Sequence, residues 1–132
     1  MDKPTPCTYC SLAPARIVEE SSLSIAFRDA FPVSDGHTLI IPRRHTASFF
    51  DLTLQEREDM MNLITRVKHR LQNELNPQGF NVGVNEGFAA GQTVMHTSMH
   101  LIPRFKGDVP DPRGGVRWLF PDKAVFWDKK PD

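Results

Sequence analysis

Cysteine, tyrosine and long apolar runs are scarce in this sequence, and neither sign of charge is in excess. Lysine plus arginine and aspartate plus glutamate each total 16, so no overall field draws the chain to nucleic acid or anionic lipid. No apolar run approaches the roughly 20 residues of a membrane-spanning helix. The first residues lead into polar sequence rather than the apolar stretch of a signal peptide. We therefore expect a cytoplasmic protein without nucleic-acid or membrane partners, in which a local site recognises any phosphate.

Both cysteines lie in one short turn, Cys7-Thr8-Tyr9-Cys10. A redox pair of the thioredoxin type normally follows a strand and opens a helix, whereas no strand precedes this pair. Metal binding is therefore favoured over redox chemistry. Zinc needs four nitrogen or sulfur ligands, so two histidines from elsewhere would have to complete a site. Two plain buried thiols are the alternative.

The spacing of apolar residues predicts one domain of the α+β class with an antiparallel sheet. Strands are expected over residues 16–20, 23–28, 37–42 and 80–84. Thr53 and Glu56 fit a capping box, and the apolar stripe of the helix that follows runs from Met60 to Leu75. Residues 106–132 have no periodicity and hold arginine and tryptophan among proline and glycine. We expect them to form an extended C-terminal tail packed on the domain of residues 1–105.

The most informative segment runs from Gly91 to Arg104. Its polar residues alternate, which predicts a β-strand with His96, Ser98 and His100 on one face. Side chains at every second position of a strand recur about every 6.6–6.8 Å. Such a row suits the binding of something long and charged.

This segment resembles the signature strand of the histidine triad (HIT) superfamily of nucleotide hydrolases and transferases. That signature is His-x-His-x-His followed by two apolar residues, with Gly-Gln-Thr-Val before it and Ile-Pro-Arg after it, as here. The resemblance covers about residues 5–105. It implies a HIT-like fold, and a homodimer formed through the long helix and a sheet edge.

One position departs from the signature. The middle histidine of the family attacks the α-phosphate of a nucleotide, and Ser98 occupies that position here. A neutral imidazole is nucleophilic at pH 7, whereas a serine hydroxyl needs an adjacent base. Neither flanking histidine is well placed to be that base. A single change in an intact motif is more typical of an engineered trap than of natural drift, and both origins remain open.

The resemblance also assigns expected roles to the surrounding polar residues. His45 and His96 would complete a structural zinc site with Cys7 and Cys10. His100 would lie beside the α-phosphate, as in the hydrolase branches, and His37 would be its partner. Asp29 would bind the ribose hydroxyls, with a turn carboxylate as the alternative role. The remaining nucleotide-binding positions are Asn85, Gln92 and Thr93 as phosphate donors and Gly91 for close backbone approach, with an ordinary turn glycine as its alternative.

The implied activity is hydrolysis at the α-phosphate through a nucleotidyl-histidine intermediate. Dinucleoside polyphosphates and nucleoside phosphoramidates are both substrates within the family. Because Ser98 replaces the nucleophile, we expect this chain to be a catalytically impaired hydrolase. The rival interpretations are a non-catalytic nucleotide-binding sensor, and a zinc-stabilised interaction protein that uses its tryptophan-containing tail.

Overall fold

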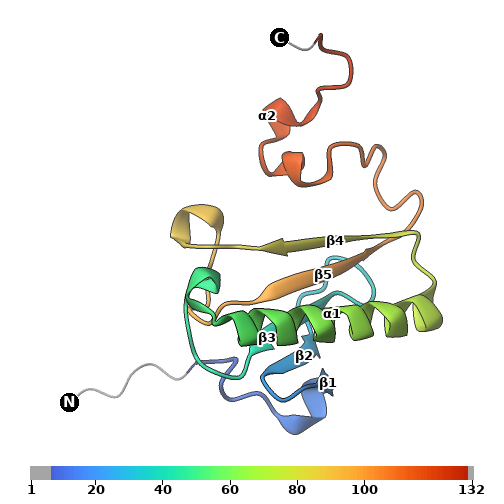
Figure 1. Ribbon diagram of the computed structural model, residues 1–132. Helices are drawn as coiled ribbons and strands as arrows, with labels where there is room; N and C mark the ends of the chain where they lie inside the picture. Colours follow the sequence, from blue (N-terminus) through green and yellow to red (C-terminus); the bar gives the residue numbers. More distant parts are fainter. Residues whose placement is uncertain (1–6, 131–132) are drawn as a thin grey trace.

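An antiparallel sheet covered on one face by a long helix forms the body of this protein in a computed structural model, which describes residues 7–130 (Figure 1). Within those residues the strand order is β1-β2-β3-β5-β4. The strands are β1 (Ile17–Glu20), β2 (Ser24–Arg28), β3 (Thr38–Pro42), β4 (Gly79–Val84) and β5 (Met99–Arg104), and the helix is α1 (Leu54–Leu75). The predicted α+β class is confirmed.

Helix α1 begins and ends where local sequence signals place its boundaries. Thr53 Oγ1 accepts a hydrogen bond from the Glu56 N–H at 3.0 Å, and Glu56 Oε1 accepts one from the Thr53 N–H at 2.9 Å, which completes the predicted capping box. A hydrogen bond from Arg44 to the same carboxylate lowers the pKa of Glu56 to about 2. Asn76, with φ of 51°, ends the helix in the left-handed conformation. No helix of residues 7–130 is both long enough and apolar enough to span a bilayer.

The hydrophobic core lies between α1 and the sheet. Met60, Leu63 and Val67 of the helix pack with apolar residues of β2, β3 and β5. Burial alternates along β5, so Met99 and Leu101 face the helix. Because successive side chains of a strand point to opposite faces, the intervening residues of β5 lie on the face without the helix. Those residues are His100, Ile102 and Arg104.

The prediction of a strand over residues 91–104 is wrong for its first half. Regular pairing begins only at Met99, and residues 91–98 form turns and bends. The Thr97 N–H donates to the Thr46 carbonyl at 2.7 Å, so this stretch is held by the loop after β3 rather than by a β-ladder. His96 therefore precedes the strand and does not share its regular face with His100.

Short helical turns complete the described chain. They are η1 (Pro14–Arg16), η2 (Phe49–Asp51), η3 (Phe88–Ala90), η4 (Gly115–Leu119) and α2 (Pro121–Ala124). The last two lie in residues 106–130, which leave the sheet after β5 as a projecting C-terminal arm (Figure 1). Arg104 binds Asp108 at 2.8 and 2.9 Å at the base of this arm. Within it, the Arg113 guanidinium lies 4.1 Å from the centre of the Trp127 ring.

Candidate functional site

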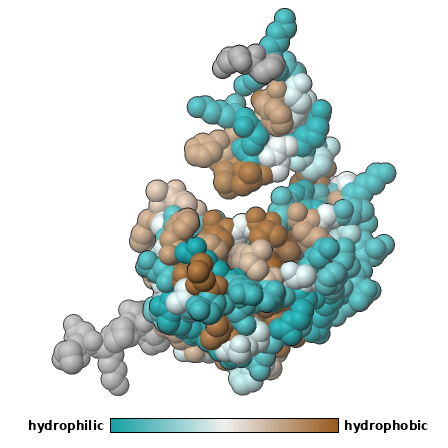
Figure 2. Space-filling view, in the orientation of Figure 1, coloured by the Kyte–Doolittle hydropathy of each residue, from teal (hydrophilic) through white to brown (hydrophobic). Residues whose placement is uncertain are grey.

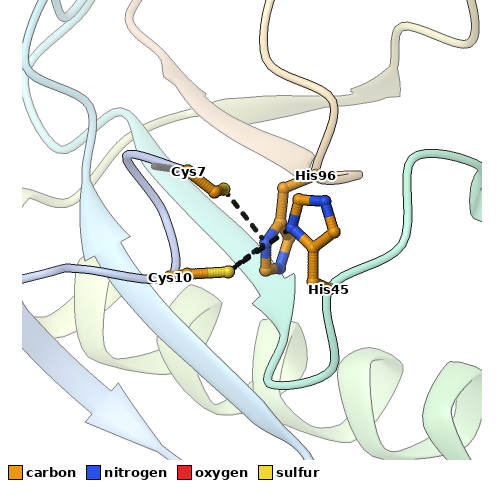
Figure 3. A group of neighbouring side chains, drawn as sticks. All are labelled: Cys7, Cys10, His45 and His96. Carbon is orange, nitrogen blue, oxygen red and sulfur yellow. Dashed lines mark hydrogen bonds between the residues drawn. The ribbon is translucent and has the colours of Figure 1, made fainter. Parts of the chain in front are cut away.

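Four side chains of the kind that bind zinc meet beside the segment that leads into β5 (Figure 3). Cys7 and Cys10 come from the N-terminal turn, His45 from the loop after β3, and His96 from the loop before β5. The Cys7 Sγ lies 3.5 Å from His96 Nδ1, and the Cys10 Sγ lies 3.4 Å from His45 Nδ1 and 3.5 Å from His96 Nδ1. Residues nearly ninety positions apart thus form one cluster.

This Cys/His cluster fits a tetrahedral zinc ion. Zinc bonds to nitrogen and sulfur of ~2.0–2.3 Å imply separations of roughly 3.3–3.8 Å between ligand atoms, which the observed separations match. His96 Nε2 donates to the Pro42 carbonyl at 2.8 Å, which leaves the Nδ1 lone pair directed at the cysteines. Burial lowers the pKa of His96 and so keeps its imidazole in the neutral form that a metal requires.

A cavity of about 330 Å³ lies beside the cluster and contains most of the remaining predicted site residues. Ser98 and His100 line it together, whereas His96 and His37 do not. The other predicted nucleotide-binding residues that line it are Asp29, Asn85, Gly91, Gln92 and Thr93. The three positions of the triad are therefore divided, with His96 in the Cys/His cluster and the other two in this cavity. We call it the nucleotide cavity, after the role predicted for its residues.

A chain of hydrogen bonds fixes the protonation of His100. The Val33 N–H donates to His37 Nδ1 at 3.2 Å, so the proton of a neutral His37 is on Nε2. That Nε2 lies 2.9 Å from His100 Nδ1 and 3.6 Å from an Asp29 carboxylate oxygen. His100 Nδ1 therefore accepts, and its own proton is on Nε2. Burial lowers the pKa of both histidines, so both are neutral near pH 7.

His100 therefore offers an N–H donor and no free basic nitrogen. Its Nδ1 is occupied by His37, and its Nε2 already carries a proton. A donor of this kind suits a phosphate oxygen. It cannot take the proton of the Ser98 hydroxyl, so the pair does not form the nucleophile and base that serine catalysis requires.

Three of the predicted nucleotide-binding residues also have structural roles. Asp29 Oδ1 accepts a hydrogen bond from the Phe31 N–H at 2.8 Å, which is the turn role, while its other oxygen is directed at His37. Gln92 is buried, and its amide nitrogen donates to the Ala47 and Val94 carbonyls at 2.8 and 3.1 Å. Its side chain therefore organises the loop. Gly91 has φ of 90°, a turn conformation that by itself accounts for glycine.

The sequence did not reveal several other residues of the nucleotide cavity, among them Thr8, Tyr9, Arg16, Phe31 and Leu39. Tyr9 packs edge-on against Phe27 and His96, with ring centres 5.3 and 5.9 Å apart. Burial and the nearby Asp29 raise the pKa of Tyr9, so its hydroxyl is protonated. The sequence held a signal for Phe31, because it is a bulky aromatic residue two positions after the predicted ribose ligand. In the structure, Phe31 is 86% exposed. Arg16 carried no comparable signal.

Comparison with known proteins identifies relatives over this body. The family model of the HIT domain matches residues 11–107. A HIT-like protein of Mycoplasma genitalium is 37% identical over 104 residues, 76% of this chain and 74% of that protein. An asymmetrical bis(5'-nucleosyl)-tetraphosphatase of Schizosaccharomyces pombe is 34% identical over 94 residues, 71% of this chain and 52% of that protein. A zinc-bound histidine triad family protein from Mycobacterium smegmatis superposes with a TM-score of 0.71 at 32% identity, covering 80% of this chain and 84% of that one.

Proposed function

The chain belongs to the HIT family, and on that premise we propose that it binds a nucleotide in the nucleotide cavity with the α-phosphate between Ser98 and His100. One observation carries this proposal: Ser98 and His100 line the same cavity as Asp29, Asn85 and Thr93. A carboxylate accepts hydrogen bonds from ribose hydroxyls, and neutral donors stabilise charge on phosphate oxygens. The cavity thus offers the complementary groups of a nucleoside phosphate in one place.

Each end of the nucleotide has a counterpart in this proposal. Asp29 binds the ribose, and the exposed ring of Phe31 packs on the base. Asn85 and Thr93 donate to phosphate oxygens together with the His100 Nε2–H. Gln92 supports the loop through its bonds to Ala47 and Val94, because its amide hydrogens are already engaged.

The activity of the intact site is hydrolysis at the α-phosphate. A histidine at position 98 would attack the α-phosphorus, the leaving group would depart, and water would hydrolyse the nucleotidyl-histidine. Ser98 leaves this chain without that nucleophile, and the neutral His100 with its proton on Nε2 does not activate the hydroxyl. We therefore propose a catalytically impaired hydrolase whose ligand class is a dinucleoside polyphosphate or a nucleoside phosphoramidate. The same hydrogen-bond chain favours the alternative of a nucleotide-binding sensor, because it allows binding without turnover.

Structural zinc completes the proposal. Cys7, Cys10, His45 and His96 fill all four positions of a tetrahedral ion, so no position is left open for substrate. Zinc in such a closed site supplies folding stability rather than chemistry. The zinc-bound relative supports this assignment.

We further propose that residues 1–105 form the HIT domain, that residues 106–132 are an accessory segment of it, and that the protein is a homodimer. Strand β4 is an edge strand of the sheet, and among the described residues no strand pairs with its outer edge. A free edge offers unpaired backbone groups to a second chain. Val82 on this strand and Met61 on α1 are 54% and 52% exposed, so both elements of the proposed interface carry exposed apolar surface. Sedimentation would test this arrangement.

Replacing Ser98 tests the function directly. Ser98→His should raise hydrolysis of at least one dinucleoside polyphosphate or phosphoramidate by on the order of a thousandfold or more, since it restores the covalent nucleophile. Ser98→Ala is the matched control and should remain at the level of the parent chain. Mass spectrometry of the rapidly quenched Ser98→His protein should detect a nucleotidyl adduct on the peptide that contains the introduced histidine. A Ser98→His protein that binds adenosine monophosphate yet turns over no substrate of either class would refute hydrolase ancestry.

A further inference from the structure

A row of paired residues runs across the sheet beneath the nucleotide cavity. His100 of β5 pairs with Leu39 of β3, and Leu39 pairs with Phe27 of β2. Phe27 pairs in turn with Ile17 of β1. The first three of these residues all line the cavity. Because neighbouring strands are ~4.8 Å apart, the cavity extends roughly 10 Å across the sheet from the backbone of His100 to that of Phe27.

The two ends of this row differ. At His100 the cavity meets a larger hollow between the body and the C-terminal arm, which Figure 2 shows. Asn85 and His100 line both spaces, and this is the end at which we place the phosphate. Arg16 lies at the opposite end, where it immediately precedes Ile17. Its guanidinium is the one Lys or Arg head group in the described lining of the nucleotide cavity.

Two contacts hold the Arg16 guanidinium at this end. Its Nη2 donates a hydrogen bond to the Arg28 carbonyl at 3.0 Å, and its central carbon lies 5.4 Å from the centre of the Phe27 ring. Arg28 directly precedes Asp29, the proposed ribose ligand. Within residues 7–130 this is the one hydrogen bond of the Arg16 side chain, so four of its five N–H donors remain for a ligand.

We propose that Arg16 binds the base of the nucleotide and makes the nucleotide cavity selective for guanine over adenine. This inference rests on the proposed function, because it takes the α-phosphate to lie at His100 and the ribose at Asp29. A nucleotide placed in this way directs its base towards Arg16, beside the exposed ring of Phe31. The donors that the guanidinium presents to the edge of the base then decide which base binds best.

Guanine matches a planar pair of N–H donors, and adenine does not. The O6 and N7 atoms of guanine are adjacent acceptors, and one guanidinium binds both of them at once. Adenine keeps the N7 acceptor but carries an N6 amino group where guanine has O6, so a donor would face a donor. A bidentate pair of this kind gives a preference of about tenfold or more.

The competing role for a cation in a nucleotide site is a contact with phosphate. The position of Arg16 disfavours that role, because its guanidinium lies over Phe27, two strands away from His100. Neutral donors line the phosphate end instead, among them Asn85 and Thr93. The two roles also make different predictions, since a phosphate contact would strengthen the binding of every nucleotide equally.

Calorimetry on the parent chain compares four monophosphates that differ only in the base. Guanosine monophosphate should bind about tenfold more tightly than adenosine monophosphate. Inosine monophosphate keeps both O6 and N7 and should bind like the guanosine nucleotide. 7-Deazaguanosine monophosphate lacks the N7 acceptor and should lose most of the preference. Equal affinity for the guanine and adenine nucleotides, or a preference that survives the loss of N7, would overturn the inference.

Variants of Arg16 assign the preference to this side chain. Arg16→Gln should weaken binding of guanosine monophosphate about tenfold and leave binding of adenosine monophosphate nearly unchanged. Arg16→Lys keeps the charge but not the planar pair of donors, so it should also lose most of the preference. Lys68→Gln on α1 removes the same charge from the opposite face of the sheet and should retain it. Equal losses for both nucleotides in Arg16→Gln would identify a phosphate contact and contradict base recognition.

Other outcomes separate this inference from the proposed function. If the parent binds neither guanosine nor adenosine monophosphate, the nucleotide cavity itself is wrong and the inference fails with it. If both nucleotides bind with the same affinity and Asp29→Ala weakens both, the cavity is right and only the role of Arg16 is wrong. The comparison of the four monophosphates uses the parent chain alone, so it decides the question even if a variant of Arg16 fails to fold.

Discussion

His96 and His100 are only four residues apart, yet they belong to two regions of opposite design. The Cys/His cluster is a closed set of four side chains, from three loops, that each offer one nitrogen or sulfur atom to a metal. The nucleotide cavity is an open space lined by neutral donors, the carboxylate of Asp29, the guanidinium of Arg16, and Ser98. On the proposed assignment, the signature segment contributes one histidine to a structural anchor, the Cys/His cluster, and one to a binding site, the nucleotide cavity. A change at position 98 alters the binding site without removing any ligand of the anchor.

The two regions also meet at the N-terminal turn, most closely at Tyr9. Tyr9 lies between the two cysteines in sequence, packs on His96, and lines the nucleotide cavity. The turn that would close around zinc therefore also forms part of the cavity wall. The predictions that follow test how far the two regions are independent, beginning with the largest expected effect.

Removing the anchor should have the largest effect on stability. Protein purified without chelator should contain close to one zinc per chain, and Cys7→Ser should lose it. Because metal binding to a folded site is itself folding free energy, the loss should lower the free energy of unfolding by on the order of 5 kcal/mol. Elemental analysis and urea unfolding measure both effects. His69→Ala, an exposed helix position, is the control and should retain metal and stability. A Cys7→Ser protein with full zinc content would refute this ligand set.

Changing the cavity should reduce ligand binding and leave the metal in place. Adenosine monophosphate at a hundredfold excess over its Kd should add about 2.7 kcal/mol to the free energy of unfolding, which a thermal melt reports as a rise in Tm of several degrees. Asp29→Ala should weaken binding of this ribonucleotide about tenfold, the loss of a carboxylate acceptor. Dideoxyadenosine monophosphate, which lacks the ribose hydroxyls, is the matched ligand. Asp29→Ala should weaken its binding much less. Equal losses of affinity for both nucleotides would show that Asp29 only stabilises its turn and does not bind the ribose.

Tyr9 should report the coupling between the two regions. Tyr9→Ala should keep zinc but weaken nucleotide binding by about threefold to tenfold, since it removes an aromatic wall of the cavity. Tyr9→Phe preserves the ring packing on Phe27 and His96 and should bind nearly as the parent does. Chelation of the parent should weaken nucleotide binding at least as much as Tyr9→Ala does. Unchanged affinity after the metal is removed would mean that the two regions are independent.

Features encoded by neighbouring residues were predictable from the sequence, and α1 is the clearest example. Thr53, Glu56 and Asn76 fix its ends through contacts within a turn, and the buried stripe follows from spacing. The start of β5 was not predictable in this way. The Thr97 bond to Thr46 and the Gln92 bond to Ala47 join segments about 45–50 residues apart, and alternation in the sequence carries no information about either.

The Cys/His cluster and the C-terminal arm also differ in how far the sequence predicts them. The Cys-x-x-Cys turn pointed to a metal by itself, and the resemblance supplied the two histidines that the structure brings to it. The path of the C-terminal arm had no sequence signal. It depends on the Arg104 bonds to Asp108 and on the packing of Arg113 against Trp127, contacts that no periodic pattern encodes.

The smallest expected effect concerns pH and the pair His37 and His100. Burial lowers the pKa of each in the folded state below the unfolded value of about 6.5, so the unfolded chain binds more protons as the pH falls below that value. Their contribution to stability is thus complete above about pH 6.5 and is lost as the pH falls. Each such proton steepens the dependence of the unfolding free energy on pH by at most about 1.4 kcal/mol per pH unit. The nearby Asp29 reduces this effect, because it favours the charged form of both rings.

A variant without one of the two rings isolates this effect from the acid sensitivity of the zinc ligands. Urea unfolding of zinc-saturated parent and His37→Asn protein between pH 7.5 and 5.5 should give a flatter dependence for the variant, by up to about 1 kcal/mol over the range. His69→Ala should follow the parent, because that side chain is exposed on α1. Parallel curves for the parent and His37→Asn would mean that the buried pair does not titrate on unfolding. Other groups, among them the Cys/His cluster, would then account for the acid sensitivity of the protein.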